Sequence, residues 1–304
     1  MEPVLKVNVA GLEISNPTML AAGVLGISHS SLERVYQAGA GAVVTKSIGI
    51  NPRKGYPNPT IVHLGFGLLN AMGLPNSGID EYCKEVILAK EHGVKVVASI
   101  FGSLPSDFQT LASKMESSGA DAIELNLSCP HVKGVGMQIG HDPEFIHTIV
   151  SAVKSVVKIP VFTKLTPNVT NIVDIAKVAE NAGVDAITAI NTVRAMAIDI
   201  ETGRPLLANK IGGLSGQAIQ PIALRCVYEI SKSVDVPVIG VGGILNWRDA
   251  VAFLLAGASA IQLGTAIAIR GLNVFHEINE GLKKYMSKKG YKNVNEFIGF
   301  SHKY

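Results

Sequence analysis

Residues 182–187 read AGVDAI, and this hexapeptide has three near-copies elsewhere in the chain. The copies are AGAGAV at residues 38–43, SGADAI at 118–123 and AGASAI at 256–261. A second recurring unit, a short β-branched run, reads KVVAS at 95–99, IPVFTK at 159–164 and VPVIG at 236–240. Each glycine ends a helical pattern and leads into an apolar strand, which is typical of repeated βα units around a parallel sheet.

Counting both kinds of unit predicts eight strands separated by helical patterns. The strands fall near residues 18–24, 42–47, 95–101, 122–128, 160–166, 186–192, 237–242 and 260–265. Eight such units in about 250 residues have the size of a (β/α)8 TIM barrel. We therefore predict an α/β barrel that forms a single domain over residues 1–304. A doubly wound sheet is the alternative, although its usual GxGxxG fingerprint occurs nowhere in the chain.

Three segments exceed what a barrel needs. Residues 1–17 alternate around Gly11 and predict an N-terminal hairpin that covers the bottom of the barrel. Residues 48–80 follow the second strand, and residues 193–216, with a hairpin turn near residues 200–204, follow the sixth. Long connections in compact domains are usually functional. Both insertions leave from the carboxyl ends of strands, the face where barrel active sites are built.

Composition and charge narrow the class of protein. The chain has 304 residues, a formal net charge of +3 and no basic stripe, so we expect no nucleic-acid partner. Its three cysteines lack metal-type spacing, which predicts no metal site and no disulfide framework, and fits the cytoplasm. Residues 250–269 carry no charge over a membrane-spanning length, but a buried helix followed by a buried strand explains them, and we expect no membrane association.

Polar side chains gather at the predicted carboxyl ends of the strands. They are Lys46, Asn126, Cys129, Lys164 and Asn191. Any one of them alone could be a cap or a solvated group, but five converging groups are hard to explain as packing. Lysines can stabilise negative charge on a heterocycle such as a flavin, and asparagines offer both donors and acceptors. A thiolate on a proline-stiffened loop can act as a general base, which makes Cys129 a candidate.

Glycines stand at the ends of the last two strands, at Gly240, Gly242 and Gly243 and at Gly264. Glycine lets backbone N–H groups approach a phosphate closely, and the phosphate site of many barrels lies after these strands. The alternative is that these glycines only form two tight turns and bind no ligand. The pattern predicts a phosphorylated metabolite or a phosphate-bearing cofactor.

Several motifs resemble the class 1 dihydroorotate dehydrogenases, and most closely the class 1B catalytic subunit. The motifs are TKS at residues 45–47, NAMGLPN at 70–76, NLSCP at 126–130, the run from 191 to 200, LAN at 207–209, GGLSG at 212–216, PIALR at 221–225 and GVGGI at 240–244. The resemblance spans nearly the whole chain. It implies an FMN-bearing barrel that oxidises dihydroorotate to orotate in pyrimidine biosynthesis.

The resemblance also implies roles for residues at matching positions. Cys129 would remove the C5 proton while a hydride leaves C6 for the flavin, with Lys46 as a second catalytic group. The implied substrate residues are Lys46, Asn70, Met72, Gly73, Leu74, Asn126, His131, Asn191 and Thr192. The implied FMN residues are Ala22, Gly23, Lys46, Ser47, Ser99, Asn126, Lys164, Ile190, Gly216, Gly242, Gly243, Gly264 and Thr265. A serine base and an N-terminal anchor mark the membrane-bound class 2, which this chain does not resemble.

One position departs from the family pattern. His131 stands where the family usually has asparagine, and dihydropyrimidine dehydrogenases carry histidine there. That activity is therefore the first alternative. An isomerase or Schiff-base aldolase using Lys164 would explain the phosphate loops but not Cys129. A non-catalytic flavoprotein is a further alternative.

The route of the electrons also follows from the resemblance. Class 1B catalytic subunits pass electrons to NAD through a partner that carries FAD and an iron–sulfur cluster, around a homodimer core of a heterotetramer. This chain has too few cysteines for its own cluster and no dinucleotide fingerprint, so it would need such a partner. A class 1A homodimer that reduces fumarate is the alternative, because the motif at residues 72–76 occurs in both classes.

Overall fold

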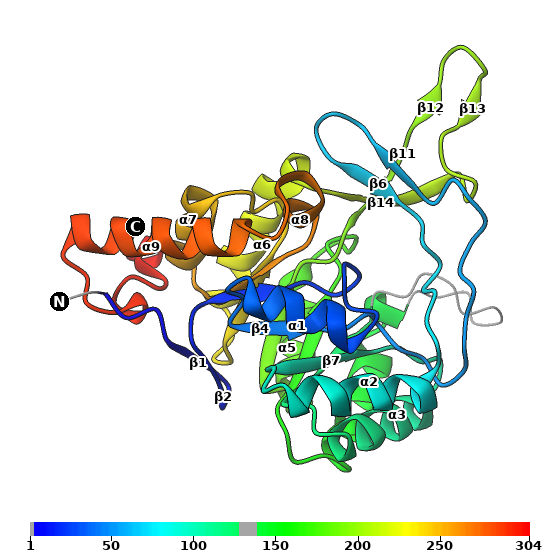
Figure 1. Ribbon diagram of the computed structural model, residues 1–304, viewed down its shortest axis with the longest axis horizontal. Helices are drawn as coiled ribbons and strands as arrows, with labels where there is room; N and C mark the ends of the chain where they lie inside the picture. The colour runs from blue at the N-terminus through cyan, green and yellow to red at the C-terminus, as the bar shows by residue number, and fades with distance from the viewer. Residues whose placement is uncertain (1–2, 128–138) are drawn as a thin grey trace.

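A closed barrel of eight parallel strands forms the centre of the molecule, as the sequence predicts (Figure 1). The computed structural model describes residues 3–127 and 139–304. In chain order the barrel strands are β3 (Thr18–Leu20), β4 (Ala42–Val44), β7 (Val96–Ile100), β8 (Ala122–Asn126), β9 (Val161–Leu165), β10 (Ala186–Ala189), β15 (Val238–Val241) and β16 (Ala258–Leu263). Each strand pairs with the next one in the chain, and β16 closes the barrel on β3.

Helices surround the strands on the outside of the barrel. They are α1 (His29–Gln37), α2 (Ile79–Glu91), α3 (Pro105–Ser117), α4 (Pro143–Lys154), α5 (Ile172–Asn181), α6 (Gln220–Ser231), α7 (Trp247–Leu255), α8 (Thr265–Arg270) and α9 (Val274–Lys289). Short 3-10 turns lie at Ile139–His141, Gln217–Ile219, Val294–Glu296 and Phe300–Lys303. Residues 250–269 form parts of α7, β16 and α8, and no helix in the described ranges is both long and apolar enough to span a bilayer.

The repeated hexapeptide works as a helix-to-strand joint. Gly183 has φ +94° after α5, a conformation that glycine adopts without a steric penalty. Two residues later, Asp185 Oδ2 accepts hydrogen bonds from Val161 N at 2.7 Å and from Lys154 Nζ at 2.7 Å. The aspartate therefore ties the start of β10 to the start of β9. Asp121 ties β8 to β7 in the same way, through Val96 N at 2.8 Å.

The predicted N-terminal hairpin is confirmed. Strands β1 (Val7–Val9) and β2 (Leu12–Ile14) pair antiparallel and bury the apolar side chain of each end residue. The turn at Gly11 lies close to Pro160, which directly precedes β9. The hairpin therefore packs against the amino-terminal ends of the barrel strands, on the side opposite the insertions.

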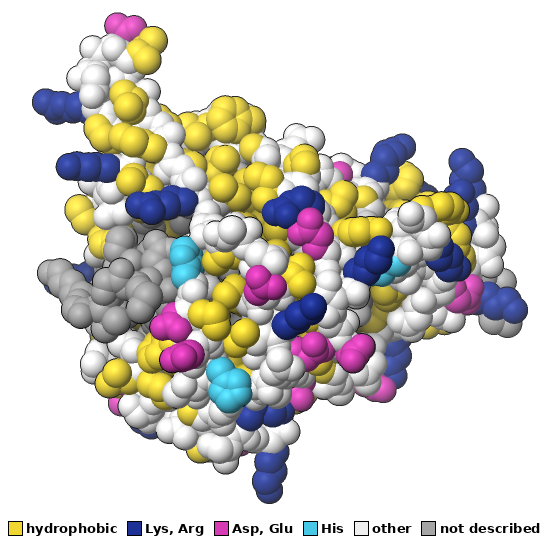
Figure 2. Space-filling view, turned by 180° about the vertical axis from the view of Figure 1, so that it is seen from behind, with side chains coloured by type: hydrophobic (Ala, Val, Ile, Leu, Met, Phe, Trp, Pro, Cys, Tyr) yellow, Lys and Arg dark blue, Asp and Glu magenta, His cyan; other side chains and the backbone are white. Residues whose placement is uncertain are grey.

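The two predicted insertions join in one sheet above the carboxyl ends of the barrel strands (Figure 1). The first insertion supplies β5 (Ile61–His63) and β6 (Leu68–Asn70), and the second supplies β11 (Val193–Met196) and β14 (Ile211–Ser215), in the order β11-β14-β6-β5. The predicted turn is confirmed as a protruding hairpin of β12 (Ile198–Asp199) and β13 (Arg204–Pro205). Figure 2 shows hydrophobic and basic side chains along this protrusion.

Candidate active site

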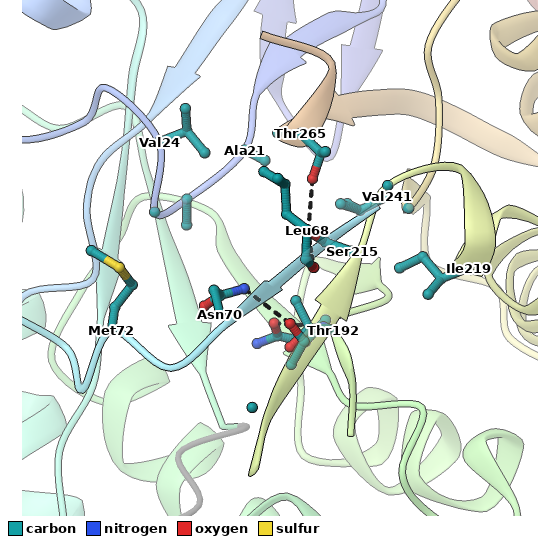
Figure 3. A pocket seen from close by; sticks show the side chains of 18 of the residues that line it. Ala21, Val24, Leu68, Asn70, Met72, Thr192, Ser215, Ile219, Val241 and Thr265 are labelled. Carbon is teal, nitrogen blue, oxygen red and sulfur yellow. Dashed lines mark hydrogen bonds between the residues drawn. The ribbon is translucent and has the colours of Figure 1, made fainter. Parts of the chain in front are cut away.

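A cavity of about 730 Å³ lies between the carboxyl ends of the barrel strands and the four-stranded sheet (Figure 3). Most of the residues that the sequence singled out line it. These are Ala22, Gly23, Lys46, Ser47, Asn70, Met72, Gly73, Leu74, Asn126, Lys164, Ile190, Asn191, Thr192, Gly216, Gly242, Gly243, Gly264 and Thr265. They come from segments up to about 240 residues apart in the chain, so the barrel and the sheet together assemble the site.

Lys46 lies two residues beyond β4, and only 6% of its surface is exposed. Its backbone N–H donates to Gly26 O at 2.8 Å, which holds the main chain. Burial lowers the pKa of the Lys46 amine, because the charged form loses solvation. Within residues 3–127 and 139–304 no carboxylate pairs with this ammonium group, so an anionic ligand in the cavity would be its natural partner.

Amide and hydroxyl groups form a chain across the floor of the cavity. Asn191 Nδ2 donates to Asn126 Oδ1 at 3.4 Å, and Asn126 Nδ2 donates to Ser47 Oγ at 3.0 Å. Ser47 in turn shares a hydrogen bond of 2.9 Å with Ser99. The chain fixes the orientation of both amides, which line the cavity.

The second lysine at the floor belongs to a buried polar group. Lys164 Nζ donates to Gln262 Oε1 at 3.1 Å and lies 3.6 Å from Glu124 Oε1. Lys164 and Gln262 line the cavity, whereas Glu124 is fully buried behind them. Lys164 can therefore present positive charge to a ligand while a carboxylate holds it from the other side.

Glycines and hydroxyls line the end of the cavity nearest β15 and β16. Gly242 and Gly243 have φ values of +132° and +75°, which side-chain-bearing residues rarely adopt. A Cβ on Gly243 would lie 2.6 Å from Gln220 Cβ, so the backbone can come this close only as glycine. Thr265 Oγ1 donates to Ser215 Oγ at 2.8 Å, a contact drawn in Figure 3. A glycine backbone that a ligand can approach this closely suits a phosphate group.

The four-stranded sheet closes the cavity from above. Asn70, at the end of β6, donates from Nδ2 to Gly213 O at 3.2 Å, and Thr192 lies directly opposite in Figure 3. Neither Gly212 nor Gly213 could carry a Cβ, which would lie 2.4 Å from Asn70 O and 2.1 Å from Thr192 Oγ1 respectively. The two glycines therefore let β14 pass close to Asn70 and Thr192, which both line the cavity.

Three of the predicted site residues need separate comment. Cys129 and His131 lie outside the described residues. Ser99 is fully buried and is not among the residues that line the cavity. Because it bonds Ser47 from behind, its predicted contribution to cofactor binding would be indirect.

Other polar residues line the cavity although no sequence pattern singled them out. They are Arg53, Tyr56, Thr166, Asn168, Arg194, Asn209, Ser215 and Gln262. Asn168 follows β9 and links it to β11, because its Nδ2 donates to Thr192 O at 3.1 Å and its Oδ1 accepts from Arg194 N at 2.8 Å. Gln262 could have been selected from the sequence, because it is the single polar residue in the apolar run of residues 260–263. Ser215 had no sequence feature that marks it as a site residue, apart from its place in the GGLSG motif.

Comparison with known proteins decides the family. The family model described as dihydroorotate dehydrogenase matches residues 4–286. The chain belongs to the dihydroorotate dehydrogenase family. It is 53% identical over 299 residues to the dihydroorotate dehydrogenase B (NAD(+)), catalytic subunit, of Pyrococcus abyssi, covering 98% of this chain and 99% of the relative. The subunit of the same name from Methanocella arvoryzae is 51% identical over 296 residues, covering 97% of each chain.

A solved structure agrees with the fold of this dihydroorotate dehydrogenase family member. The crystal structure of a DHODH from Eimeria tenella in complex with ferulenol superposes with a TM-score of 0.85 at 24% identity, covering 99% of this chain and 89% of that one. The names of the relatives confirm the class 1B resemblance and favour none of the alternatives, whether dihydropyrimidine dehydrogenase, fumarate-linked homodimer or aldolase.

Proposed function

We propose that the chain is the catalytic subunit of a class 1B dihydroorotate dehydrogenase, which oxidises dihydroorotate to orotate with FMN as its flavin. The observation that carries the proposal is the arrangement of one cavity with a glycine-rich end and a floor of two buried lysines. The family supplies the reaction, and the cavity offers a matching set of groups for both ligands.

The residues present fit FMN. The Gly242–Gly243 backbone would hold the phosphate, because glycine lets backbone N–H groups come close where no side chain fits, and Ser215 and Thr265 line the same end of the cavity. Lys164 would face the pyrimidine part of the ring system and stabilise negative charge there. When bound, FMN would accept the two electrons released by the substrate.

The remaining groups fit dihydroorotate. The Lys46 ammonium would pair with the substrate carboxylate, which would offset its own desolvation. Asn70 from above and Asn126, Asn191 and Thr192 from below would bond the ring amides and carbonyls, which fixes the ring against the flavin. Cys129, which follows β8 by three residues in the sequence, would take the proton from the neighbouring carbon, a role that rests on the sequence resemblance.

The electrons would leave through a second protein. The relatives are named catalytic subunits, and the sequence has three cysteines and no dinucleotide fingerprint. Four thiolates normally hold an iron–sulfur cluster. We therefore propose a partner subunit with FAD and an iron–sulfur cluster, assembled with a homodimer of this chain into a heterotetramer that reduces NAD.

Rapid mixing tests the proposal. The purified chain should show a flavin spectrum and release FMN on denaturation, and dihydroorotate should bleach the flavin faster than dihydrouracil, which lacks the carboxylate for Lys46. Alone, the chain should reduce artificial dyes but not NAD, and adding the cognate partner should start NAD reduction. A colourless protein that cannot be reconstituted with FMN would refute the flavin. Faster bleaching by dihydrouracil would refute the substrate, and efficient NAD or fumarate reduction by the chain alone would refute the partner.

A further inference from the structure

A carboxylate lies inside the barrel, below the floor of the cavity. Glu124 in β8 has no exposed surface, and its side chain contacts side chains from three other strands. The interiors of such barrels are usually filled with branched apolar residues. A buried charge is costly unless it is paired and hydrogen-bonded, so a carboxylate at this place calls for a specific reason.

The contacts of Glu124 converge on the lysine at the floor. Its Oε2 accepts from Gln262 Nε2 at 2.6 Å and from Thr188 Oγ1 at 3.0 Å. Its Oε1 lies 3.6 Å from Lys164 Nζ and has no hydrogen bond from any described residue. Gln262 also accepts from Lys164 Nζ at 3.1 Å, so carboxylate, amide and ammonium form a closed triangle.

The triangle has a layered geometry. In the ladder between β8 and β9, Glu124 is opposite Phe162, and Asn126 is opposite Lys164. Glu124 is therefore two residues deeper on the same face of β8 as Asn126, which lines the cavity. Lys164 and Gln262 reach the cavity and Glu124 does not, so the carboxylate can act on a ligand only through them or through its field.

We propose that Glu124 is a positioning residue that holds the Lys164 ammonium against the flavin ring. The inference rests on the proposed function, because it takes FMN to be the ligand above Lys164. Lysine has a long, flexible stem, and a point charge on such a stem stabilises a ligand only where it is held in place. Gln262 holds one donor of the ammonium, and Glu124 sets the orientation of Gln262 and attracts the ammonium directly.

Two effects of Glu124 on the flavin would have opposite signs. If the carboxylate acts only through its own negative field, the neutral variant Glu124→Gln should favour reduced FMN and raise the midpoint potential. If it acts by placing Lys164, the same variant should lose the lysine's stabilisation of negative charge and lower the potential. A purely structural role should change folding stability without a potential shift of either sign.

The test compares Glu124→Gln with wild type in two measurements, the affinity of the apoprotein for FMN and the midpoint potential against a reference dye. We expect FMN affinity to fall about tenfold and the preference for reduced over oxidised FMN to fall about tenfold, a potential about 30 mV lower for a two-electron couple. In a Lys164→Ala background, adding Glu124→Gln should change either quantity less than about twofold. Thr188→Val, which removes one hydrogen bond to Glu124 and leaves the triangle, is the matched control and should change both less than about threefold.

Three outcomes would overturn the proposal: an unchanged potential, a raised potential, or a full effect of Glu124→Gln without Lys164. If Glu124→Gln does not fold, Glu124→Asp keeps the charge but withdraws it by about one bond length, about 1.5 Å. That variant should lower the potential in the same direction by a smaller amount, and an unchanged potential would again refute the role. Wild-type protein that binds no FMN would refute the proposed function instead, so the two failures are distinguishable.

Discussion

Adding one methyl group at Gly243 tests the glycine-rich end of the cavity. The residue follows β15 with φ +75°, and a Cβ there would lie 2.6 Å from Gln220 Cβ and 2.9 Å from Gln220 N and Cα. These are atoms at the first residue of α6, which the backbone holds in place. Gly183 provides a matched control at the opposite end of the barrel, because it has φ +94° but nothing within 4 Å of its Cβ position.

The structure separates two costs in these variants. A side chain at positive φ costs about 1–2 kcal/mol in either position. Overpacking against Gln220 adds about 1–3 kcal/mol at position 243 alone. Gly243→Ala should therefore lower the free energy of unfolding of the apoprotein by about 2–5 kcal/mol, and Gly183→Ala by about 1–2 kcal/mol. The start of α6 must move to admit the methyl group, so FMN should bind Gly243→Ala at least about tenfold more weakly, about 1.4 kcal/mol.

Two assays check these values. Urea denaturation of the apoproteins gives the free energies of unfolding, and quenching of FMN fluorescence on titration gives the affinities. Gly183→Ala should bind FMN as wild type does, because the altered turn is far from the cavity. Wild-type FMN affinity in a folded Gly243→Ala variant would refute the reasoning that the phosphate lies against this backbone. An equal loss of FMN affinity in both variants would mean that general destabilisation, and not the position of the phosphate, weakens binding.

Three further predictions concern single side chains. Because desolvation lowers the pKa of Lys46, the affinity for orotate should fall as pH rises through that lowered pKa, and Lys46→Met should remove this dependence in orotate titrations. The same shift means that the unfolded chain holds the proton to higher pH than the folded protein does. The free energy of unfolding of the ligand-free protein should therefore rise with pH between the lowered and the ordinary lysine pKa. Asp185→Asn should cost about 1 kcal/mol in urea denaturation, because the bond to Val161 N weakens and a partly exposed pair with Lys154 is lost; no change would refute the joint between strands. Cys129→Ala should keep FMN but slow flavin reduction by about 10²–10⁴, and near-normal reduction would assign the proton to another group.

The repeat and the strand ends were readable from the sequence alone. Each hexapeptide such as AGVDAI combines a glycine at positive φ with an apolar run, so its change from helix to strand is encoded locally. The eight strands, the N-terminal hairpin and the hairpin near residues 200–204 could therefore be predicted from local patterns. Lys46, Asn126, Lys164 and Asn191 could also be selected from sequence. Parallel strands bring their carboxyl ends to one face of a barrel, whatever the details of packing.

The tertiary structure decided which groups meet. Joining β6 to β14 in one sheet needs strands about 140 residues apart, and no periodicity within either insertion encodes that pairing. The sequence patterns assigned no role to Glu124, although it is the single charged residue of β8, and its contact with Gln262, 138 residues later, exists only because the barrel closes. Ser99 was selected by motif position but is one layer behind the cavity. Local patterns determine which face a side chain points to, whereas depth and partners across the barrel depend on closure, which no single segment of the chain contains.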